Sequence, residues 1–251
     1  MGDPDVGQAF IVGAQRCGTT SLATALERHP NVVLAQPRRP EPKVFLIPGA
    51  ADHVDEYVDR WYGHAGPDTR LRVEKSTSYL ESDVACGEIA RAFPDARIIV
   101  LLRDPVDRAV SHYGFSQEQG AESLPMAEAL DPAAEGRPWD REVISVSPFH
   151  YLSRGRYAED LPRWLDTFGR DSVHVVILED LLAEPERFSE LERDLGLEPG
   201  NGFSAEERHN AAEGDITLDV ETRARLAAWF ADANADLAER LGRPIDQWAH
   251  A

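Results

Sequence analysis

The sequence predicts an α/β fold with a doubly wound, mostly parallel sheet, and three observations lead to it. Short apolar segments alternate with segments of helical periodicity along most of the chain, as they do in βαβ units. Residues 97–102 (RIIVLL) are continuously apolar, which is typical of a parallel strand buried on both faces. Residues 13–21 form a glycine-containing loop between a strand pattern and a helix pattern. A chain of 251 residues suits one domain of this class, residues 1–251.

The expected strands are short and apolar, and polar or turn residues follow them. They are residues 9–13, 31–34, 71–74, 97–102 and 173–178. In a doubly wound sheet, ligands bind beyond the carboxyl ends of the strands. The loop at residues 13–21, Lys75 and Arg103 each follow a strand, so we expect them along one edge of the molecule.

Helical spacing of apolar residues, together with start and stop signals, predicts the helices. They are residues 19–28, 52–62, 82–93, 104–119, 157–168, 184–195 and 220–241. Pro30 and Pro94 lie just beyond two of the helix ends, and Asp104-Pro105 supplies an N-cap and a first-turn proline for another. The apolar side of the last helix is expected to hold Leu226, Trp229, Phe230, Leu237 and Leu241.

Two segments fit neither pattern. Residues 36–48 are rich in proline and basic residues, and we expect an ordered loop there. Residues 120–146 are polar, acidic and contain proline, which predicts a lid or an insertion.

The net charge of −19 limits the partners of the protein. A negative field spread along the chain repels nucleic acid, acidic membranes and sulfated or uronic polysaccharides. We therefore expect a small, neutral, cationic or lipidic partner and no nucleic acid. The sequence contains no apolar run long enough for an integral membrane segment and no apolar secretory leader, so we expect a cytoplasmic protein. Its oligomeric state is left open.

The loop at residues 13–21 is almost a P-loop. Gly13 and Gly18 have the spacing of G-x-x-x-x-G-K-[ST], but Thr19 stands where that motif has lysine, and Arg16 is the cation within the loop. Backbone N–H groups, hydroxyls and this guanidinium could converge on one anion. The pattern indicates a phosphoryl-like donor that is not an ordinary nucleoside triphosphate; the alternative is a plain glycine turn. Thiol chemistry at Cys17 is disfavoured, because the phosphatase pattern needs arginine at position 23.

Arg103 and Ser111 form a second candidate anion site. Arg103 ends a strand, and Ser111 lies two turns into the helix that follows. Alone, this is an ordinary capped helix. With the loop at residues 13–21, it indicates a ligand that carries two separate phosphates.

Five motifs, in this order along residues 8–180, resemble the sulfotransferases that use 3′-phosphoadenosine 5′-phosphosulfate (PAPS), with the bacterial and heparan-sulfate-type branches most similar. They are GAQRCGTTSL, EPKVFL, VEKSTSYL, VLLRDPVDRAVSHY and GRYAEDLPRWLDTF. The resemblance implies a P-loop-kinase-like fold, a first loop that binds the 5′-phosphosulfate, and a second motif that binds the 3′-phosphate. The donor-binding residues that it implies are Arg16, Cys17, Gly18, Thr19, Thr20, Ser21, Arg103, Ser111 and Tyr157. For Tyr157, the alternative is a core aromatic residue at a helix start.

The resemblance also implies three catalytic residues. Glu41 matches the family's catalytic carboxylate, although by itself it is an acid on a surface loop. Lys75, one of only two lysines in the chain, matches the family's lysine; the alternative is a salt bridge with Glu74 or another acid. Arg16 stands where the family usually has lysine, and its role is expected to be electrostatic because arginine does not donate its proton.

The expected reaction is sulfuryl transfer from PAPS to a hydroxyl of a small-molecule, glycoside or lipid acceptor. Glu41 would act as the general base, adenosine 3′,5′-bisphosphate would be the product, and no metal would be needed. Whether oxygen or nitrogen accepts the group is left open. The alternatives are a P-loop kinase that uses ATP and magnesium, and a non-catalytic nucleotide-binding protein.

Overall fold

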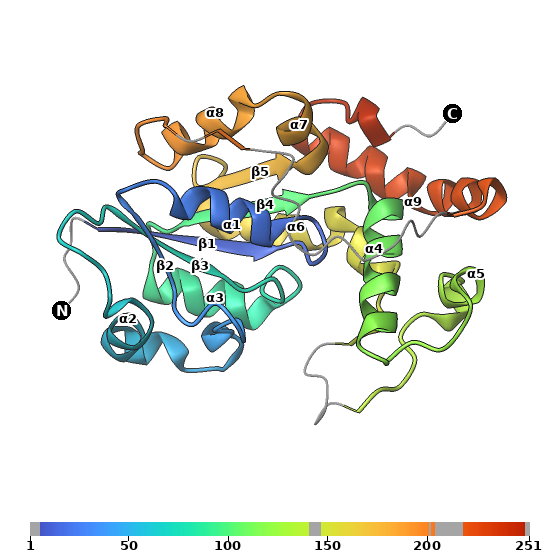
Figure 1. Cartoon of the computed structure of the whole chain (residues 1–251), viewed down its shortest axis with the longest axis horizontal. Coiled ribbons are helices and arrows are strands. Elements are labelled where there is room, and N and C mark those ends of the chain that lie inside the picture. The colour runs from blue at the N-terminus through green and yellow to red at the C-terminus, as the bar shows by residue number, and fades with distance from the viewer. Residues whose placement is uncertain (1–5, 141–146, 201, 204–217, 249–251) are drawn as a thin grey trace. The chain divides into compact units, whose positions relative to one another are not determined.

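The computed structural model describes residues 6–140, 147–200, 202–203 and 218–248 (Figure 1). The chain forms two compact units. The first consists of Met1–Leu102 and Leu161–His209, and the second of Arg103–Asp160 and Asn210–Ala251.

The first unit contains a five-stranded sheet in which every pairing is parallel. Its strands are β1 (Gly7–Gly13), β2 (Val32–Leu34), β3 (Leu71–Lys75), β4 (Arg97–Leu102) and β5 (Val173–Ile177). Their order is β2-β3-β1-β4-β5, so the chain leaves β1 toward one edge and later returns to build the other. This confirms the predicted doubly wound α/β class, and each strand that the sequence predicts is present.

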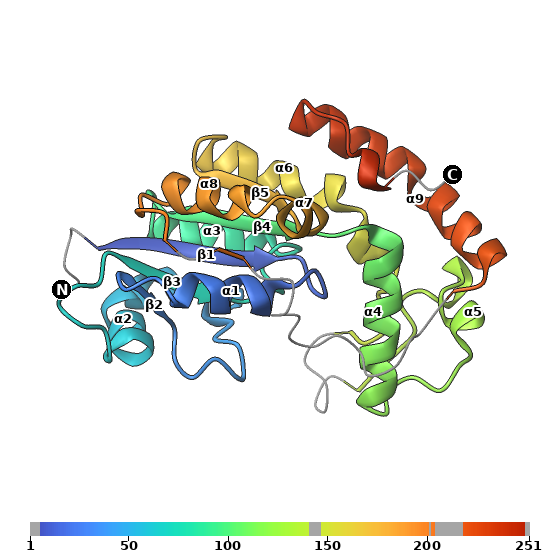
Figure 2. The ribbon, with the colours of Figure 1, turned by 45° about the horizontal axis from the view of Figure 1, so that its top comes forward.

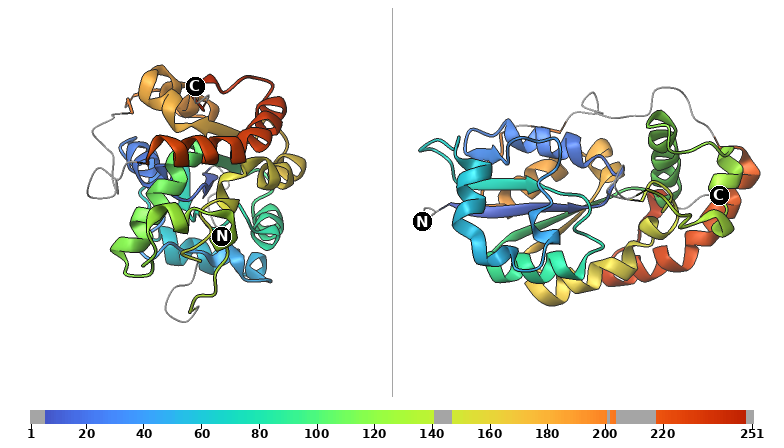
Figure 3. Two further views of the ribbon diagram at one scale, coloured as in Figure 1. Left: turned by 90° about the vertical axis from the view of Figure 1, so that its right-hand side faces the viewer. Right: turned by 90° about the horizontal axis from the view of Figure 1, so that it is seen from below.

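Helices cover both faces of this sheet. They are α1 (Thr19–Glu27), α2 (Val54–Tyr62), α3 (Asp83–Ala92), α6 (Tyr157–Phe168), α7 (Leu178–Ala183) and α8 (Glu186–Asp194). The right-hand view of Figure 3 shows α1 (blue) and α8 (orange) on one face, with α3 (teal) and α6 (yellow) on the other; Figure 2 labels the same helices from a different side. Two short elements that the sequence patterns did not predict are α7 and the 3₁₀-helix η1 (Val44–Leu46). The predicted helix at residues 52–62 begins as the 3₁₀-helix η2 (Ala50–His53) and continues as α2.

An aromatic cluster fills the α2–α3 face of the sheet. The ring of Phe45 lies 5.6 Å from that of Phe10, 5.0 Å from Tyr57 and 6.1 Å from Phe93, measured between centroids. These contacts are edge-on, the arrangement that aromatic rings prefer. These contacts attach η1, and the loop before it, to the α2–α3 face of the sheet.

The second unit contains α4 (Pro105–Glu118), α5 (Met126–Ala129) and α9 (Val220–Leu241). Asp104 caps α4 as predicted, since its side chain accepts hydrogen bonds from the N–H groups of Val106 and Asp107. Helices α4 and α9 pack together around a core that includes Val106, Tyr113, Tyr151, Leu226 and Phe230.

The prediction for Trp229 is wrong: this residue is 42% exposed, while Leu226, Phe230, Ala233 and Leu237 form the buried stripe of α9. These four recur at the spacing of one narrow helix face, and Trp229 lies at its edge. The described part of the predicted lid contains α5 and the fully buried Leu130, and residues 141–146 lie outside the described residues. None of the helices in the described ranges is both long and apolar enough to cross a membrane.

Candidate active site

The loop after β1 ends at a helix that begins without a side-chain cap. Gly18, the N-cap of α1, has a φ of 88°, a left-handed conformation that favours glycine. A Cβ on Gly18 would lie 3.2 Å from a methyl carbon of Leu178, and a Cβ on Gly13 would lie 2.7 Å from Cβ of Leu80. Both glycines are therefore required by geometry. Because Gly18 has no side-chain oxygen, the first N–H groups of α1 suit an anion.

The loop side chains differ in exposure. Cys17, Thr19 and Ser21 are buried, whereas Arg16 and Thr20 are half-buried. Arg16 has a φ of 71°, which is uncommon for a residue other than glycine and marks a sharp change in chain direction. The Sγ of Cys17 contacts the carbonyl of Gln15, and no role for it as a nucleophile emerges from this buried position.

Glu41 and Lys75 form an ion pair at the same edge of the sheet. Lys75 is the last residue of β3 and lies opposite Ile11 of β1, two residues before the glycine loop. Its ammonium group donates a hydrogen bond to Oε1 of Glu41. The side chains of Glu41 and Lys75 are 17% and 16% exposed, so the pair is shielded but reachable. The acid that Lys75 pairs with is thus Glu41 rather than its neighbour Glu74.

Thr77 is a third member of this cluster, and the sequence analysis did not assign it a role. Its N–H lies 3.1 Å from Oε2 of Glu41, and its hydroxyl lies 3.2 Å from the same oxygen. The carboxylate is therefore held from two sides, by Lys75 and by Thr77. The signal in the sequence that could have identified Thr77 was a hydroxyl residue two positions after the lysine that ends a strand.

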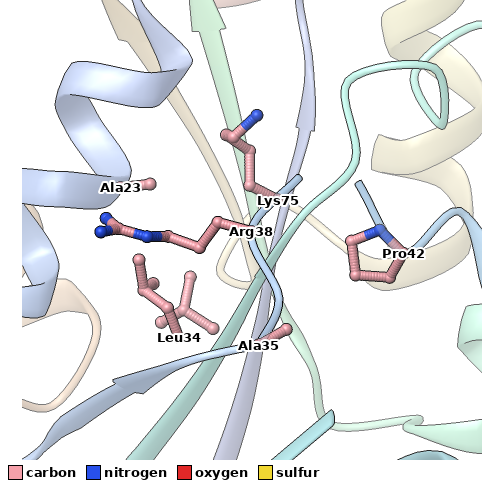
Figure 4. Close-up of a pocket in the computed structure, with 7 residues that line it drawn as sticks. Ala23, Leu34, Ala35, Arg38, Pro42 and Lys75 are labelled. Atoms are coloured by element: carbon pink, nitrogen blue, oxygen red, sulfur yellow. The ribbon is translucent and has the colours of Figure 1, made fainter. Parts of the chain in front are cut away.

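A small pocket lies beside this pair (Figure 4). Its empty volume is about 250 Å³, including the open solvent at its mouth. The residues that line it are Ala23, Leu34, Ala35, Arg38, Pro42, Val73 and Lys75. Most of this lining is apolar, and Lys75 and the aliphatic part of Arg38 complete it. Arg38 also forms an ion pair with Glu27 at 2.9 Å.

On the opposite side of β3, Glu74 is completely buried. Ser76 donates a hydrogen bond to its Oε1 at 2.6 Å, and Tyr57 donates one to its Oε2 at 2.5 Å. Burial raises the pKa of the Glu74 carboxyl, and the hydrogen bonds from Ser76 and Tyr57 oppose this rise. The pKa of Tyr57 is raised mainly by burial and further by the nearby carboxylate. The sequence analysis considered Glu74 only as a partner for Lys75.

Three further residues with predicted roles, Arg103, Ser111 and Tyr157, belong to the second unit. The Tyr157 hydroxyl donates a hydrogen bond to the Arg103 carbonyl at 2.8 Å, and its buried ring packs on Trp248 with centroids 5.9 Å apart. Ser111 is half-buried on α4. The structure thus joins Tyr157 to Arg103 directly.

No group of three or more His, Cys, Asp or Glu residues that could hold a metal ion occurs within the described ranges.

Comparisons with known proteins match this chain to sulfotransferases. A family model described as "Sulfotransferase family" matches residues 47–198. Among curated proteins, the mouse bifunctional heparan sulfate N-deacetylase/N-sulfotransferase 3 is 27% identical over 270 residues. The bovine bifunctional heparan sulfate N-deacetylase/N-sulfotransferase 2 is 27% identical over 273 residues. Each alignment covers 95% of this chain but only 30% of the relative, so the chain spans less than a third of these curated proteins.

Solved structures give the same match. A sulfotransferase from Alicyclobacillus acidocaldarius aligns with a TM-score of 0.76 and 27% identity over 99% of both chains. Mouse sulfotransferase SULT7A1, solved in complex with PAP, aligns with a TM-score of 0.55 and 13% identity over 94% of this chain and 88% of that one. At this lower identity the likeness concerns the fold.

Proposed function

Because this chain belongs to the sulfotransferase family, we propose that it transfers a sulfuryl group from PAPS to a hydroxyl of a small-molecule, glycoside or lipid acceptor, with Glu41 as the general base. The observation that carries this proposal is the cluster of Glu41, Lys75 and Thr77 at the sheet edge where the glycine loop also begins. A half-shielded carboxylate next to an ammonium group can accept a proton while the neighbouring cation stabilises developing negative charge.

Each residue of the cluster has a distinct task. Glu41 takes the proton of the acceptor hydroxyl, whose oxygen forms a bond to sulfur. Thr77 keeps the carboxylate oriented through its N–H and its hydroxyl. As Glu41 takes up the proton and becomes neutral, the ammonium group of Lys75 interacts less strongly with it. The ammonium group then stabilises the negative charge on the sulfonate oxygens. When bound, PAPS supplies the sulfuryl group, and cleavage of its S–O bond to the 5′-phosphate leaves adenosine 3′,5′-bisphosphate.

The glycine loop is proposed to bind the phosphosulfate end of the donor. The uncapped N-terminus of α1 offers N–H groups, and Arg16 and Thr20 are the half-buried side chains of the loop. Arg103 and Ser111 are proposed to bind the 3′-phosphate, as their match to the family's second motif implies. Each charge-assisted hydrogen bond of this kind contributes roughly 1.5–3 kcal/mol.

The pocket beside Lys75 is proposed to hold the apolar part of the acceptor. Its mainly apolar lining suits an apolar group of the acceptor better than a charged one. This agrees with the net charge of −19, which disfavours polyanions. An alkyl glucoside, which combines hydroxyls with an apolar tail, is therefore a suitable first acceptor.

The test measures sulfate transfer from PAPS to a panel of octyl glucoside, a primary alcohol and a phenol. Glu41→Gln should lower kcat by about 10²–10⁴, because the amide cannot take the proton. Affinity for adenosine 3′,5′-bisphosphate, measured by calorimetry, should stay within about twofold, since the substitution leaves the donor loop intact. The matched control is Glu56→Gln on α2, where the side chain is 82% exposed, and its kcat should equal that of the wild type.

Three outcomes contradict the proposal. A Glu41→Gln enzyme with wild-type turnover would exclude Glu41 as the base. A thermal shift with ATP and magnesium but none with adenosine 3′,5′-bisphosphate would favour a kinase instead. Tight bisphosphate binding without transfer to any acceptor of the panel would favour a non-catalytic nucleotide-binding protein.

A further inference from the structure

The short segment that carries Glu41 is attached to the sheet through a buried network. The N–H of Lys43 donates a hydrogen bond to Oγ of Ser76 at 3.0 Å, and the N–H of Phe45 donates one to the Tyr79 hydroxyl at 3.2 Å. Ser76, Tyr79 and Phe45 are all fully buried. Two alternate N–H groups of the segment are therefore bound by two hydroxyls that follow β3.

One of these hydroxyls is also hydrogen-bonded to Glu74: Ser76 donates to its Oε1 at 2.6 Å. A hydroxyl has a single proton to donate. Because Ser76 donates that proton to Glu74, its oxygen accepts the backbone N–H of Lys43.

The backbone between this anchor and Glu41 has little freedom. Glu41 stands between Pro40 and Pro42, whose rings fix their own φ angles. A residue before proline is also restricted to extended conformations, and this applies to Glu41. Once the N–H of Lys43 is held by Ser76, few positions remain for the Glu41 side chain. The carboxylate then lies against Lys75 and Thr77.

Successive residues of β3 alternate between the two faces of the sheet, so Glu74 and Lys75 act on the same segment from opposite sides. Burying a carboxyl group is unfavourable unless hydrogen bonds compensate, and an apolar residue would be easier to accommodate there. We propose that Glu74 is a positioning residue for sulfuryl transfer: acting through Ser76, its buried carboxyl group places the segment that presents Glu41 to Lys75. This inference rests on the proposed function of Glu41.

The chain offers a matched pair of substitutions to test this inference. Ser76 and Tyr57 are both buried, and both hydroxyls donate a hydrogen bond to Glu74. The Ser76 hydroxyl also accepts the N–H of Lys43, whereas the Tyr57 hydroxyl contacts Tyr62 at 3.3 Å. Ser76→Ala therefore releases the segment, while Tyr57→Phe removes an equivalent hydrogen bond from the same carboxyl group and leaves the segment attached.

The first measurement is amide hydrogen exchange of the free protein at residues 43–46. Ser76→Ala should speed exchange at Lys43 by about tenfold, because a net hydrogen bond is worth up to about that factor. Tyr57→Phe should leave exchange at this amide as in the wild type. Equal exchange at Lys43 in the two variants would overturn the positioning role.

The second measurement is turnover of PAPS with octyl glucoside, and with water in its absence. We expect Ser76→Ala to lower kcat by about tenfold with an unchanged KM for PAPS, and Tyr57→Phe to leave kcat unchanged even if both variants lose similar thermal stability. Glu74→Gln, whose amide must donate within the network, should lower kcat in the same way. Equal kcat in Ser76→Ala and Tyr57→Phe would overturn the inference. A wild-type protein that turns over no PAPS would instead overturn the proposed function, and the exchange comparison would still decide whether Glu74 places the segment.

Discussion

The resemblance to PAPS-dependent sulfotransferases implies a lysine at the position that Arg16 occupies in this chain. Its φ of 71° places the backbone in a sharp turn, and the side chain is half-buried at the start of α1. A guanidinium can bind two oxygens at once but keeps its proton at any accessible pH. In the proposed reaction it therefore stabilises charge on the phosphosulfate and does not protonate the leaving oxygen.

Replacements of Arg16 distinguish charge stabilisation on the phosphosulfate from protonation of the leaving oxygen. Arg16→Ala should lower kcat by about 10²–10³, the effect of losing one preorganised charge-stabilising donor. Arg16→Lys should retain most of the activity and make kcat depend on pH near the pKa of the new amine. The control is Arg187→Ala on α8, a 45%-exposed arginine in a surface ion-pair network. Unchanged turnover of Arg16→Ala would exclude the electrostatic role.

The same residue scale shows what sequence patterns reveal about the candidate site and what they miss. Glu41 and Lys75 were identified from motifs, and the structure places them in direct contact although 34 residues separate them. Thr77 and Glu74 were missed as functional candidates because their roles depend on the side of the sheet on which each side chain lies. In the sequence, Glu74 is next to Lys75 and was therefore interpreted as its ion-pair partner. Successive side chains of β3 point to opposite faces of the sheet, so the two side chains lie on different faces.

At the scale of the elements, prediction succeeded where a single pattern dominates. The apolar run of β4 and the Asp104-Pro105 start of α4 are local signals, and both are present in the structure. Helix α7 was missed because it begins at Leu178, directly after the last residue of β5, without a separating turn. Trp229 was misplaced because hydrophobicity alone does not distinguish the centre of an apolar stripe from its edge.

Strand β5 carries a pH-sensitive element of stability at His174. Burial lowers the pKa of this imidazole from 6.5, Asp194 at 3.8 Å opposes the shift, and Arg97 adds to it. Since the folded pKa is below the unfolded one, the unfolded state takes up the proton first as the pH falls. The stability associated with neutral His174 is therefore complete above about pH 6.5 and is lost progressively below it.

His174→Gln should remove this part of the pH dependence. Thermal unfolding between pH 5 and pH 7.5 is expected to show a smaller fall in Tm for the variant than for the wild type. His53→Gln, at an exposed histidine on η2, is the matched control and should follow the wild-type curve. Parallel Tm curves for the wild type and His174→Gln would contradict the assigned shift.

At the scale of the whole molecule, the predicted binding residues are divided between the two compact units. The glycine loop, Glu41 and Lys75 belong to the first, and Arg103, Ser111 and Tyr157 belong to the second. Leu102 ends β4 and Arg103 begins the second unit, so the boundary falls within one predicted motif. A sequence motif records the order of residues but not the compact unit in which each side chain is packed, and the sequence therefore did not predict this division.

The charge of the whole molecule leads to a prediction about the acceptor. The curated relatives are named for heparan sulfate, a polyanion, but this chain carries a net charge of −19. A field of that sign lowers the concentration of a polyanion near the protein and slows its association, and salt screens the effect. A small pocket beside Lys75 adds a preference for a compact apolar group.

We therefore expect kcat/KM at low salt to be at least about tenfold higher for octyl glucoside than for a heparan-derived oligosaccharide with free amino groups. Raising NaCl from about 20 mM to 300 mM should narrow this ratio, because the Debye length falls below 10 Å and the repulsion of the oligosaccharide is screened. The neutral glucoside serves as the internal control, since its kcat/KM should change little with salt. Efficient use of the oligosaccharide at low salt would mean that local cations such as Arg38, Arg39 and Lys43 outweigh the net charge in selecting the acceptor.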